Sequence, residues 1–196
     1  MTRVIAGAAR GRRLAVPAGL GTRPTADRAR EALFSSIEAL RGPFPGARVL
    51  DLYAGSGAVG LEALSRGAAT AVLVESDPAA VRTLRANVEA VGLPGADVRA
   101  DRVERVVARA PGAAYDVVFC DPPYELPDRD LAVVLEDAGR TGWLATGALV
   151  VVERATRGGP WVWPEGFTAE RSRRYGEATL WYGRAAGPSP AQQSEE

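Results

Sequence analysis

The stretch RVLDLYAGSGAVGLEAL, residues 48–64, decides the predicted fold. Its first part is an apolar block typical of a buried strand, and its last part has the composition of a helix. Between them, Gly55, Gly57 and Gly60 have the spacing G-x-G-x-x-G. Glycines at this spacing let the backbone turn tightly from strand to helix and approach a ligand closely. The stretch therefore predicts a strand–loop–helix unit of an α/β domain.

Apolar strands alternate with helical segments over the rest of the chain. Strands are predicted at 47–53, 70–76, 96–100, 115–120 and 148–154, and helices at 58–66, 78–91, 101–110 and 128–141. Before them, residues 3–7 and 12–17 form a predicted short hairpin, followed by a helix over 23–41. After them, residues 167–175 and 177–183 form a hairpin that turns at Gly176. This alternation predicts an α/β fold with a doubly wound, mostly parallel sheet.

Composition limits the class of protein. A chain of 196 residues is expected to form one main domain with a real core. No apolar run approaches the ~20 residues that a membrane span needs, so no membrane partner is expected. The N-terminus lacks the apolar core of a secretion signal, and the single cysteine, Cys120, cannot form an internal disulfide. A cytoplasmic, monomeric protein is the expectation.

The residue types that are missing narrow the chemistry. The chain has no histidine, and all 24 of its basic residues are arginines. Without histidine, Ser-His-acid triads and HExxH zinc sites are impossible, and no metal site is expected. Without lysine there is neither a Walker phosphate loop nor Schiff-base chemistry. Catalysis would have to use carboxylates, hydroxyls, backbone groups, arginines or a borrowed cofactor.

Charge is distributed unevenly along a chain whose formal net charge is zero. Residues 1–30 contain seven arginines and one acidic residue, Asp27, which gives this segment a net charge of +6 and the remainder −6. A basic segment on an acidic body suggests a polyanionic partner at the N-terminal end. The alternative is a solvated surface with scattered arginines. The predicted organisation is a basic hairpin arm over 1–24, a main domain over 25–184 and a disordered tail over 185–196.

Carboxylates follow the predicted strands on either side of the glycine loop. Glu75 lies twenty positions after Gly55, where it can accept hydrogen bonds from both hydroxyls of a ribose. The pattern suits NAD as well as S-adenosylmethionine, and a ligand-free tight turn can also show it. Asp51, just before the loop, favours a cationic amino acid moiety over a pyrophosphate. Asp101 is placed to accept from an adenine amine. We therefore expect S-adenosylmethionine.

A second motif ends the strand at 115–120, in YDVVFCDPPY, residues 115–124. Two successive prolines stiffen the chain directly after Asp121. Methylating the exocyclic amine of a base requires acceptors that hold the amine hydrogens, because its lone pair is delocalised into the ring. Asp121 and the Pro122 carbonyl are such acceptors, and Tyr124 offers a ring on which an extruded base can stack. A proline-rich loop with a capping aspartate is the simpler alternative. Because ligands bind at the carboxyl ends of parallel strands, the methyl group of the donor and the exocyclic amine of the base are expected to meet in one pocket.

These motifs together resemble a known family. A (D/N/S)PP(Y/F) tetrapeptide after a glycine loop is similar to the amino-methyltransferases. RVIAGAARGRRLAVP followed by RPTADRAREALF is similar to the opening of the bacterial 16S rRNA (guanine(966)-N(2))-methyltransferases, and the likeness covers roughly residues 3–184. The resemblance implies a Rossmann-like class I methyltransferase with a seven-stranded sheet. It also implies S-adenosylmethionine as methyl donor and N2-methylated guanine in 16S rRNA of the small subunit, or of an assembly intermediate, as product.

The resemblance also assigns residues. The predicted cofactor set is Asp51, Tyr53, Ala54, Gly55, Ser56, Gly57, Glu75, Ser76, Asp101 and Arg102. The predicted substrate-amine set is Asp121, Pro122, Pro123 and Tyr124. The predicted rRNA contacts are Arg3, Arg10, Arg12, Arg13, Arg23 and Arg28. Arg102 departs from the family pattern, in which a small residue often follows the acidic residue that reads adenine.

Three other functions stay open at this point. A DNA adenine methyltransferase usually carries a separate DNA-reading module, for which 196 residues leave little room. A protein glutamine methyltransferase usually has NPPY, where this chain has Asp121. A non-catalytic rRNA-binding assembly factor would be expected to have lost some of the pocket residues, and all are present.

Overall fold

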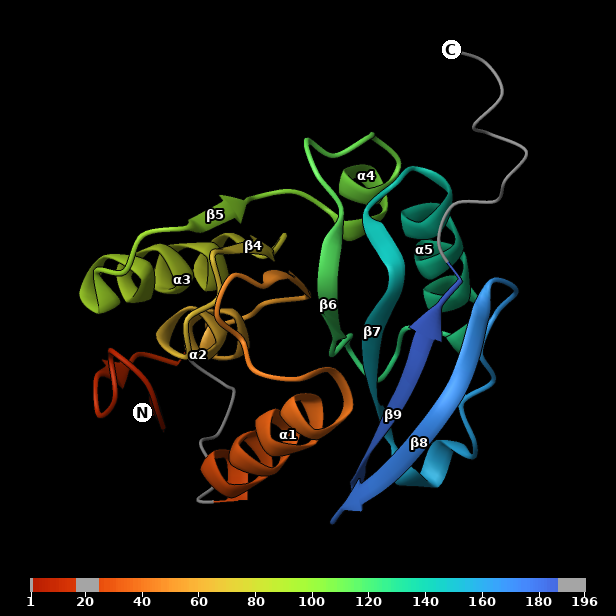
Figure 1. The fold of residues 1–196 in the computed structure, drawn as a ribbon, viewed down its shortest axis with the longest axis horizontal. Coiled ribbons are helices and arrows are strands. Elements are labelled where there is room, and N and C mark those ends of the chain that lie inside the picture. The colour runs from red at the N-terminus through yellow and green to blue at the C-terminus, as the bar shows by residue number, and fades with distance from the viewer. Residues whose placement is uncertain (1, 17–24, 187–196) are drawn as a thin grey trace. The chain divides into compact units, whose positions relative to one another are not determined.

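The computed structural model describes residues 2–16 and 25–186 (Figure 1). The chain forms two compact units, residues 1–102 and 103–196. A seven-stranded sheet has the strand order β5-β4-β3-β6-β7-β9-β8, so the predicted α/β fold with a mainly parallel, doubly wound sheet is confirmed. Arg23 and residues 187–196 of the predicted tail lie outside the described residues. The predicted limits of arm, main domain and tail stay predictions.

The first unit holds the N-terminal hairpin and the first β-α repeats. Its elements are β1 (Thr2–Arg3), β2 (Arg13–Leu14), α1 (Thr25–Arg41), β3 (Arg48–Leu52), α2 (Ala58–Ser65), β4 (Thr70–Val74), α3 (Pro78–Val91) and β5 (Ala96–Arg99). Strands β3, β4 and β5 are parallel. The apolar side chains of β3 and β4 are buried on both faces, as expected for a parallel sheet covered by helices. The core of this unit includes Leu50, Leu52, Leu61, Leu73 and Leu84.

The register of these three strands aligns their carboxyl ends. Leu52 pairs with Val74, and Val74 pairs with Arg99. The glycine loop, Glu75 and Asp101 follow closely after these positions. Parallel strands thus bring to one edge of the sheet three segments that are far apart in sequence.

Helix α3 begins and ends where the sequence predicts. The Asp77 carboxylate caps its first turn by accepting a hydrogen bond from the Ala80 N–H at 2.7 Å, and Pro78 occupies the first helical turn. Gly92 ends the helix in a left-handed conformation that favours glycine.

The N-terminal hairpin is fixed to helix α2. The Glu62 carboxylate, fully buried, accepts hydrogen bonds from the Ile5 and Ala6 N–H groups at 2.7 and 3.0 Å. The Ser65 hydroxyl accepts from the Ala9 N–H at 2.9 Å. Gly7 has φ +80°, and a Cβ there would lie 1.7 Å from the Ser65 carbonyl oxygen. Only glycine allows this close approach, so the arm is a packed part of the first unit.

The second unit holds the remaining elements. They are α4 (Val103–Val107), β6 (Tyr115–Cys120), α5 (Asp128–Arg140), β7 (Leu144–Ala155), the 3₁₀ turn η1 (Thr156–Gly158), β8 (Phe167–Tyr175) and β9 (Ala178–Ala185). Strands β6, β7, β9 and β8 lie side by side in that order (Figure 1). β6 and β7 are parallel, and β9 pairs antiparallel with both β7 and β8. The predicted C-terminal hairpin at Gly176 is confirmed. The core of this unit includes Val117, Val118, Leu131, Leu135, Leu149 and Tyr182.

Strand β7 begins earlier than the sequence predicts. It starts at Leu144, four residues before the apolar run at 148–154. The register shifts between Tyr115, which pairs with Leu144, and Val117, which pairs with Leu149. Gly147 adopts φ +73° inside this irregularity. The bulge interrupts the alternation that sequence reading relies on, which explains the missed start. Among the described residues, no helix is long and apolar enough to cross a membrane.

Candidate functional site

The glycine loop after β3 is held in a tight turn. The Ala54 N–H donates to the Val74 carbonyl at 2.8 Å, and the Gly57 N–H donates to the Ala54 carbonyl at 2.7 Å. Tyr53 has φ +67°, the only positive φ among the described non-glycine residues. Such a conformation costs on the order of 1–3 kcal/mol and is found mainly where function requires it. The loop is therefore a strong candidate for a ligand contact.

The three glycines have different roles. A Cβ at Gly57 would lie 2.3 Å from Leu84 Cδ1, and one at Gly60 would lie 2.4 Å from Leu73 Cδ2. These two glycines let helix α2 pack closely against its neighbours. A Cβ at Gly55 would meet no protein atom within 4 Å, and its φ is +55°. Gly55 thus presents bare backbone to open space, as a cofactor loop requires.

Glu75 fixes the loop from the end of β4. Its Oε2 accepts from the Gly55 N–H at 2.9 Å, and its Oε1 accepts from the Ser76 and Asp77 N–H groups at 2.7 and 2.8 Å. A carboxylate can accept about four hydrogen bonds. One acceptor position is then left on the carboxylate, so the side chain can still receive a ribose hydroxyl.

Two further carboxylates flank the loop. Asp51 is buried, and its Oδ2 accepts from the Gly60 N–H at 3.0 Å, which fixes the start of α2. The Asp101 carboxylate accepts from the Arg102 N–H at 2.8 Å, while Arg102 is exposed. With Glu75, three carboxylates surround an edge that carries bare glycine backbone. These donors and acceptors fit S-adenosylmethionine, which carries positive charge on its sulfonium and amino groups and hydroxyls on its ribose.

Asn87 joins the N-terminal arm to the glycine loop, a role that the sequence analysis missed. It is buried in α3, and its Oδ1 accepts from the Ala15 N–H at 2.8 Å. Its Nδ2 donates to the Ala15 carbonyl at 2.9 Å and to the Ser56 carbonyl at 2.8 Å. One side chain therefore holds both the end of the arm and the loop. The sequence feature that could have indicated this role is the position of the Asn87 amide on the buried helix face, which also carries Ala80, Val81, Leu84 and Val91.

The predicted nucleic-acid arginines that the structure describes lie on the surface of the first unit. Arg10, Arg12, Arg13 and Arg28 are exposed. Arg12 donates to the Ala90 carbonyl at 3.5 Å, and Arg3 forms an ion pair with Asp27 at 3.6 Å. Arg3 is thus partly neutralised, whereas no acidic residue lies within three sequence positions of Arg10 or Arg13.

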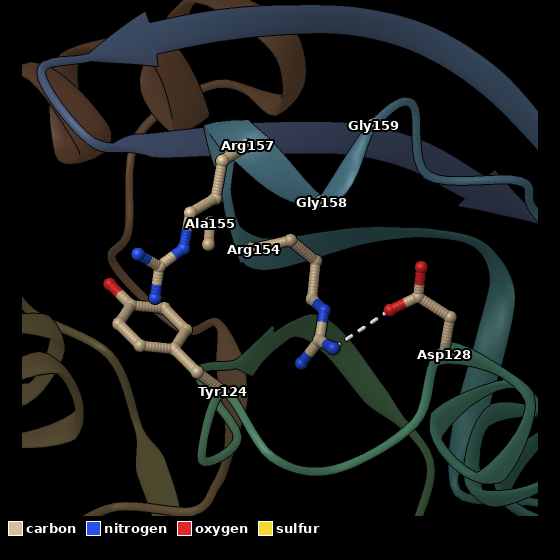
Figure 2. Close-up of a pocket in the computed structure, with 7 residues that line it drawn as sticks. All are labelled: Tyr124, Asp128, Arg154, Ala155, Arg157, Gly158 and Gly159. Carbon is tan, nitrogen blue, oxygen red and sulfur yellow. Dashed lines mark ion pairs between the residues drawn. The ribbon is translucent and has the colours of Figure 1, made fainter.

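The tetrapeptide after β6 forms a braced loop in the second unit. Pro122 is buried, whereas Tyr124 exposes 52% of its surface. The Leu126 N–H donates to the Pro123 carbonyl at 3.0 Å. Arg154, at the end of β7, donates to the Leu126 carbonyl at 2.7 Å. It also forms an ion pair with Asp128 at 2.8 Å, drawn in Figure 2. These contacts hold the loop on its C-terminal side and fix its position.

Asp121 and Glu153 occupy neighbouring positions at the ends of two parallel strands. Cys120 pairs with Val152, so the next residues along β6 and β7 are these two carboxylates. Asp121 is exposed as a whole residue, yet protein atoms packed around its carboxyl group desolvate it. Desolvation raises the pKa of Asp121 to about 6, although the charge of Arg154 opposes the rise. Desolvation, together with the charge of Asp121, raises the pKa of Glu153 to about 8. Two acids with raised pKa values, one in the tetrapeptide and one beside it, are typical of a site that moves protons.

Glu153 and Arg154 were absent from the sequence predictions. The sequence feature that could have indicated them is their place in ALVVVER, where two charged residues follow directly after an apolar run. Reading the runs of β6 and β7 as adjacent parallel strands would have placed both residues beside the tetrapeptide.

Comparison with known proteins gives a consistent match. The family described as Conserved hypothetical protein 95 matches residues 2–184. The Ribosomal RNA small subunit methyltransferase D of Escherichia coli strain K12 is 38% identical over 192 residues, which cover 96% of this chain and 93% of that protein.

Two solved structures have the same fold. The Escherichia coli protein yhhF is 35% identical with a TM-score of 0.79, and the alignment covers 93% of this chain and 97% of that one. A hypothetical protein of Thermus thermophilus is 40% identical with a TM-score of 0.77, and the alignment covers 93% and 98% of the two chains.

Proposed function

Because the chain belongs to the family described as Conserved hypothetical protein 95, we propose that it is an S-adenosylmethionine-dependent methyltransferase of small-subunit ribosomal RNA. The acceptor is the exocyclic N2 amine of a guanine. The observation that carries the choice of an amine is the braced tetrapeptide Asp121-Pro122-Pro123-Tyr124 after β6. Its fixed acceptors suit an amine whose hydrogens must be held during the reaction.

The first unit holds the methyl donor. Glu75 would receive a ribose hydroxyl at its one remaining acceptor position, Asp101 would receive the adenine amine, and the bare backbone at Gly55 would leave room for the amino acid moiety. When bound, S-adenosylmethionine supplies an electrophilic methyl group on a positively charged sulfur. Asp51 and Glu75 would offset this positive charge and so strengthen binding.

The second unit holds and activates the amine. The Asp121 carboxylate and the Pro122 carbonyl accept hydrogen bonds from the two N–H groups of the amine. These hydrogen bonds turn the nitrogen lone pair away from the ring. Tyr124 stacks on the guanine. The nitrogen gains a methyl group as the carbon–sulfur bond breaks, and it releases one proton. Asp121 receives that proton, because a pKa near 6 lets the ionised carboxylate act as a base at neutral pH.

The basic arm provides contacts to the RNA backbone. Arg10, Arg12, Arg13 and Arg28 are exposed and can pair with phosphates, while Arg23 is added from the sequence alone. Phosphate contacts position a protein on RNA without selecting a base. The proposed substrate is 16S rRNA in the small subunit or an assembly intermediate, and the enzyme acts as a monomer in the cytoplasm.

One assay tests this function against its alternatives. The protein is incubated with labelled S-adenosylmethionine and, in separate reactions, with unmodified small subunits, naked 16S rRNA, adenine-containing duplex DNA and a glutamine-containing protein substrate. Labelled N2-methylguanosine from the subunits or the rRNA supports the proposal. Label in adenine or glutamine overturns it. RNA binding without any transfer identifies a non-catalytic assembly factor.

A further inference from the structure

A pocket lies beside the tetrapeptide, within the second unit. It has a volume of about 230 Å³ and is lined by Tyr124, Asp128, Arg154, Ala155, Arg157, Gly158 and Gly159 (Figure 2). One wall is therefore the ring on which the target base is proposed to stack, and the pocket borders the proposed substrate site. The other walls come mainly from the end of β7 and the turn η1. Apart from Tyr124, the lining residues have no assigned contact with the substrate.

The charges in the pocket favour an anion. Arg154 and Arg157 are cationic, and Asp128 is the one acidic residue among the lining residues. Asp128 is already engaged, because it pairs with Arg154 at 2.8 Å. Arg157 is exposed, and within the described part of the chain its side chain forms no hydrogen bond or ion pair. Its planar group with several N–H donors matches the geometry of a phosphate.

The shape of the pocket leaves room for such a group. Gly158 and Gly159 add no side chain to its wall. A Cβ built on Gly158 would meet no protein atom within 4 Å, and the φ of this glycine is not positive. Glycine is therefore not required at position 158 by packing or by backbone conformation. Space kept open beside an arginine and an aromatic ring suits a ligand.

We propose that this pocket holds the phosphodiester group next to the target guanosine, with Arg157 as its principal cationic contact. The proposal rests on the proposed function. A nucleotide whose base stacks on Tyr124 has its phosphate only one ribose away from that ring. Arg154 stays fixed by Leu126 and Asp128 and contributes charge, whereas Arg157 reaches the ligand. The pocket then helps to hold an extruded nucleotide in place for the reaction.

Substitution of Arg157 tests the contact. Arg157→Ala is expected to raise the KM for small subunits about tenfold and to reduce the salt dependence of RNA binding by about one slope unit. Arg157→Lys should recover part of this loss. Arg129→Ala is the matched control, because Arg129 is an exposed arginine of α5 outside the pocket, with a side chain 86% exposed. Affinity for S-adenosylmethionine should stay at the parent value in all three variants.

Substitution of Gly158 tests whether the ligand needs the open volume beside this residue. Gly158→Ala should leave the melting temperature at the parent value and raise the KM for small subunits, because the added methyl group occupies the pocket. Gly112→Ala is its control, since a Cβ there also meets no protein atom within 4 Å and Gly112 lies outside the pocket. Equal kinetics for the Gly158 and Gly112 variants would overturn the proposal.

The outcomes separate this proposal from the proposed function. If the parent protein transfers no methyl group to rRNA, the proposed function fails. If the parent is active but the Arg157 and Arg129 variants behave alike, the phosphodiester site fails and the function stands. If the pocket instead binds free phosphate, inorganic phosphate should bind the protein without RNA, and Arg157→Ala should abolish this binding. That result with unchanged RNA kinetics would also overturn the proposal.

Discussion

Glu75 accepts a hydrogen bond from the backbone N–H of Gly55, with 2.9 Å between Oε2 and nitrogen. The side chain that is proposed to bind the cofactor ribose therefore also fixes the glycine loop, which is proposed to contact the same cofactor. A change at Glu75 acts on the cofactor twice, directly and through the loop.

Glu75→Ala should weaken S-adenosylmethionine binding by roughly tenfold or more. Losing a hydrogen bond to a charged acceptor costs ~1.5–3 kcal/mol, and about 1.4 kcal/mol corresponds to a factor of ten. Glu75→Gln keeps one acceptor oxygen and should lose less. Calorimetric titration of both variants measures the effect. An unchanged affinity in the alanine variant would exclude the contact.

Asp121→Ala should leave cofactor affinity close to the parent value while turnover falls by orders of magnitude, because Asp121 is assigned to the substrate amine. Desolvation of its carboxyl group raises the pKa of Asp121 to about 6, so parent activity should fall as the pH drops below about 6 and the carboxylate becomes protonated. Asp121→Asn keeps an acceptor that does not titrate, so this acid limb should disappear from its residual activity. Single-turnover rates measured from mildly acidic to mildly basic pH provide the test. An acid limb that persists in the asparagine variant would assign it to another group.

Glu153→Gln should make stability less dependent on pH. The pKa of Glu153 is raised to about 8, while an unfolded glutamate titrates near ~4.3. Between these values the native state binds more protons than the unfolded state, so this residue lowers stability progressively as pH rises to about 8. The variant should therefore lose less stability than the parent across this pH range in urea unfolding. Glu136→Gln, at an exposed position of α5, is the control and should follow the parent curve. Parallel curves for parent and Glu153 variant would contradict the assignment.

Asn87→Ala should loosen the arm and the glycine loop together. It removes the partner of the Ala15 N–H and of the Ala15 and Ser56 carbonyls, and each of these partly buried hydrogen bonds contributes about 0.5–1.5 kcal/mol. We expect faster cleavage of the arm by an arginine-specific protease and weaker cofactor binding. Thr83→Ala controls for loss of a polar side chain in α3, because the Thr83 hydroxyl donates to the Ala79 carbonyl of the same helix. Faster cleavage with parent cofactor affinity would show that the loop does not depend on Asn87.

Replacing Arg10, Arg12 and Arg13 together by alanine should weaken rRNA binding. The salt dependence of binding should flatten by about one slope unit for each phosphate that the protein no longer neutralises. Cofactor affinity should stay at the parent value, because Asn87 holds the backbone of Ala15 and none of these three side chains. A triple alanine variant of Arg105, Arg109 and Arg129 removes equal charge from the second unit as a control. If both triple variants have the same salt slope, the arm has no special role in RNA binding.

The sequence predicted most of what depends on local pattern. Helix α3 was placed at 78–91, its observed bounds, because Asp77, Pro78 and Gly92 mark both of its ends. The ends of parallel strands are recognisable from the apolar runs before them, which is how the positions of Glu75 and Asp101 at the sheet edge were predicted. Asn87 was missed because its partner, Ala15, lies 72 residues away and offers only its backbone. Glu153 was missed because its environment depends on the register between β6 and β7, which composition does not specify.

The attachment of the arm to Glu62, Ser65 and Asn87 has a consequence for synthesis. The arm is made before α2 and α3, but the hydrogen bonds that fix it join residues 56 to 72 positions apart. At ~5–20 residues per second, the ribosome needs several seconds to complete this distance. The arm must therefore wait for α2 and α3 before it can dock. Although it is made before these helices, it reaches its native position only after both have been made.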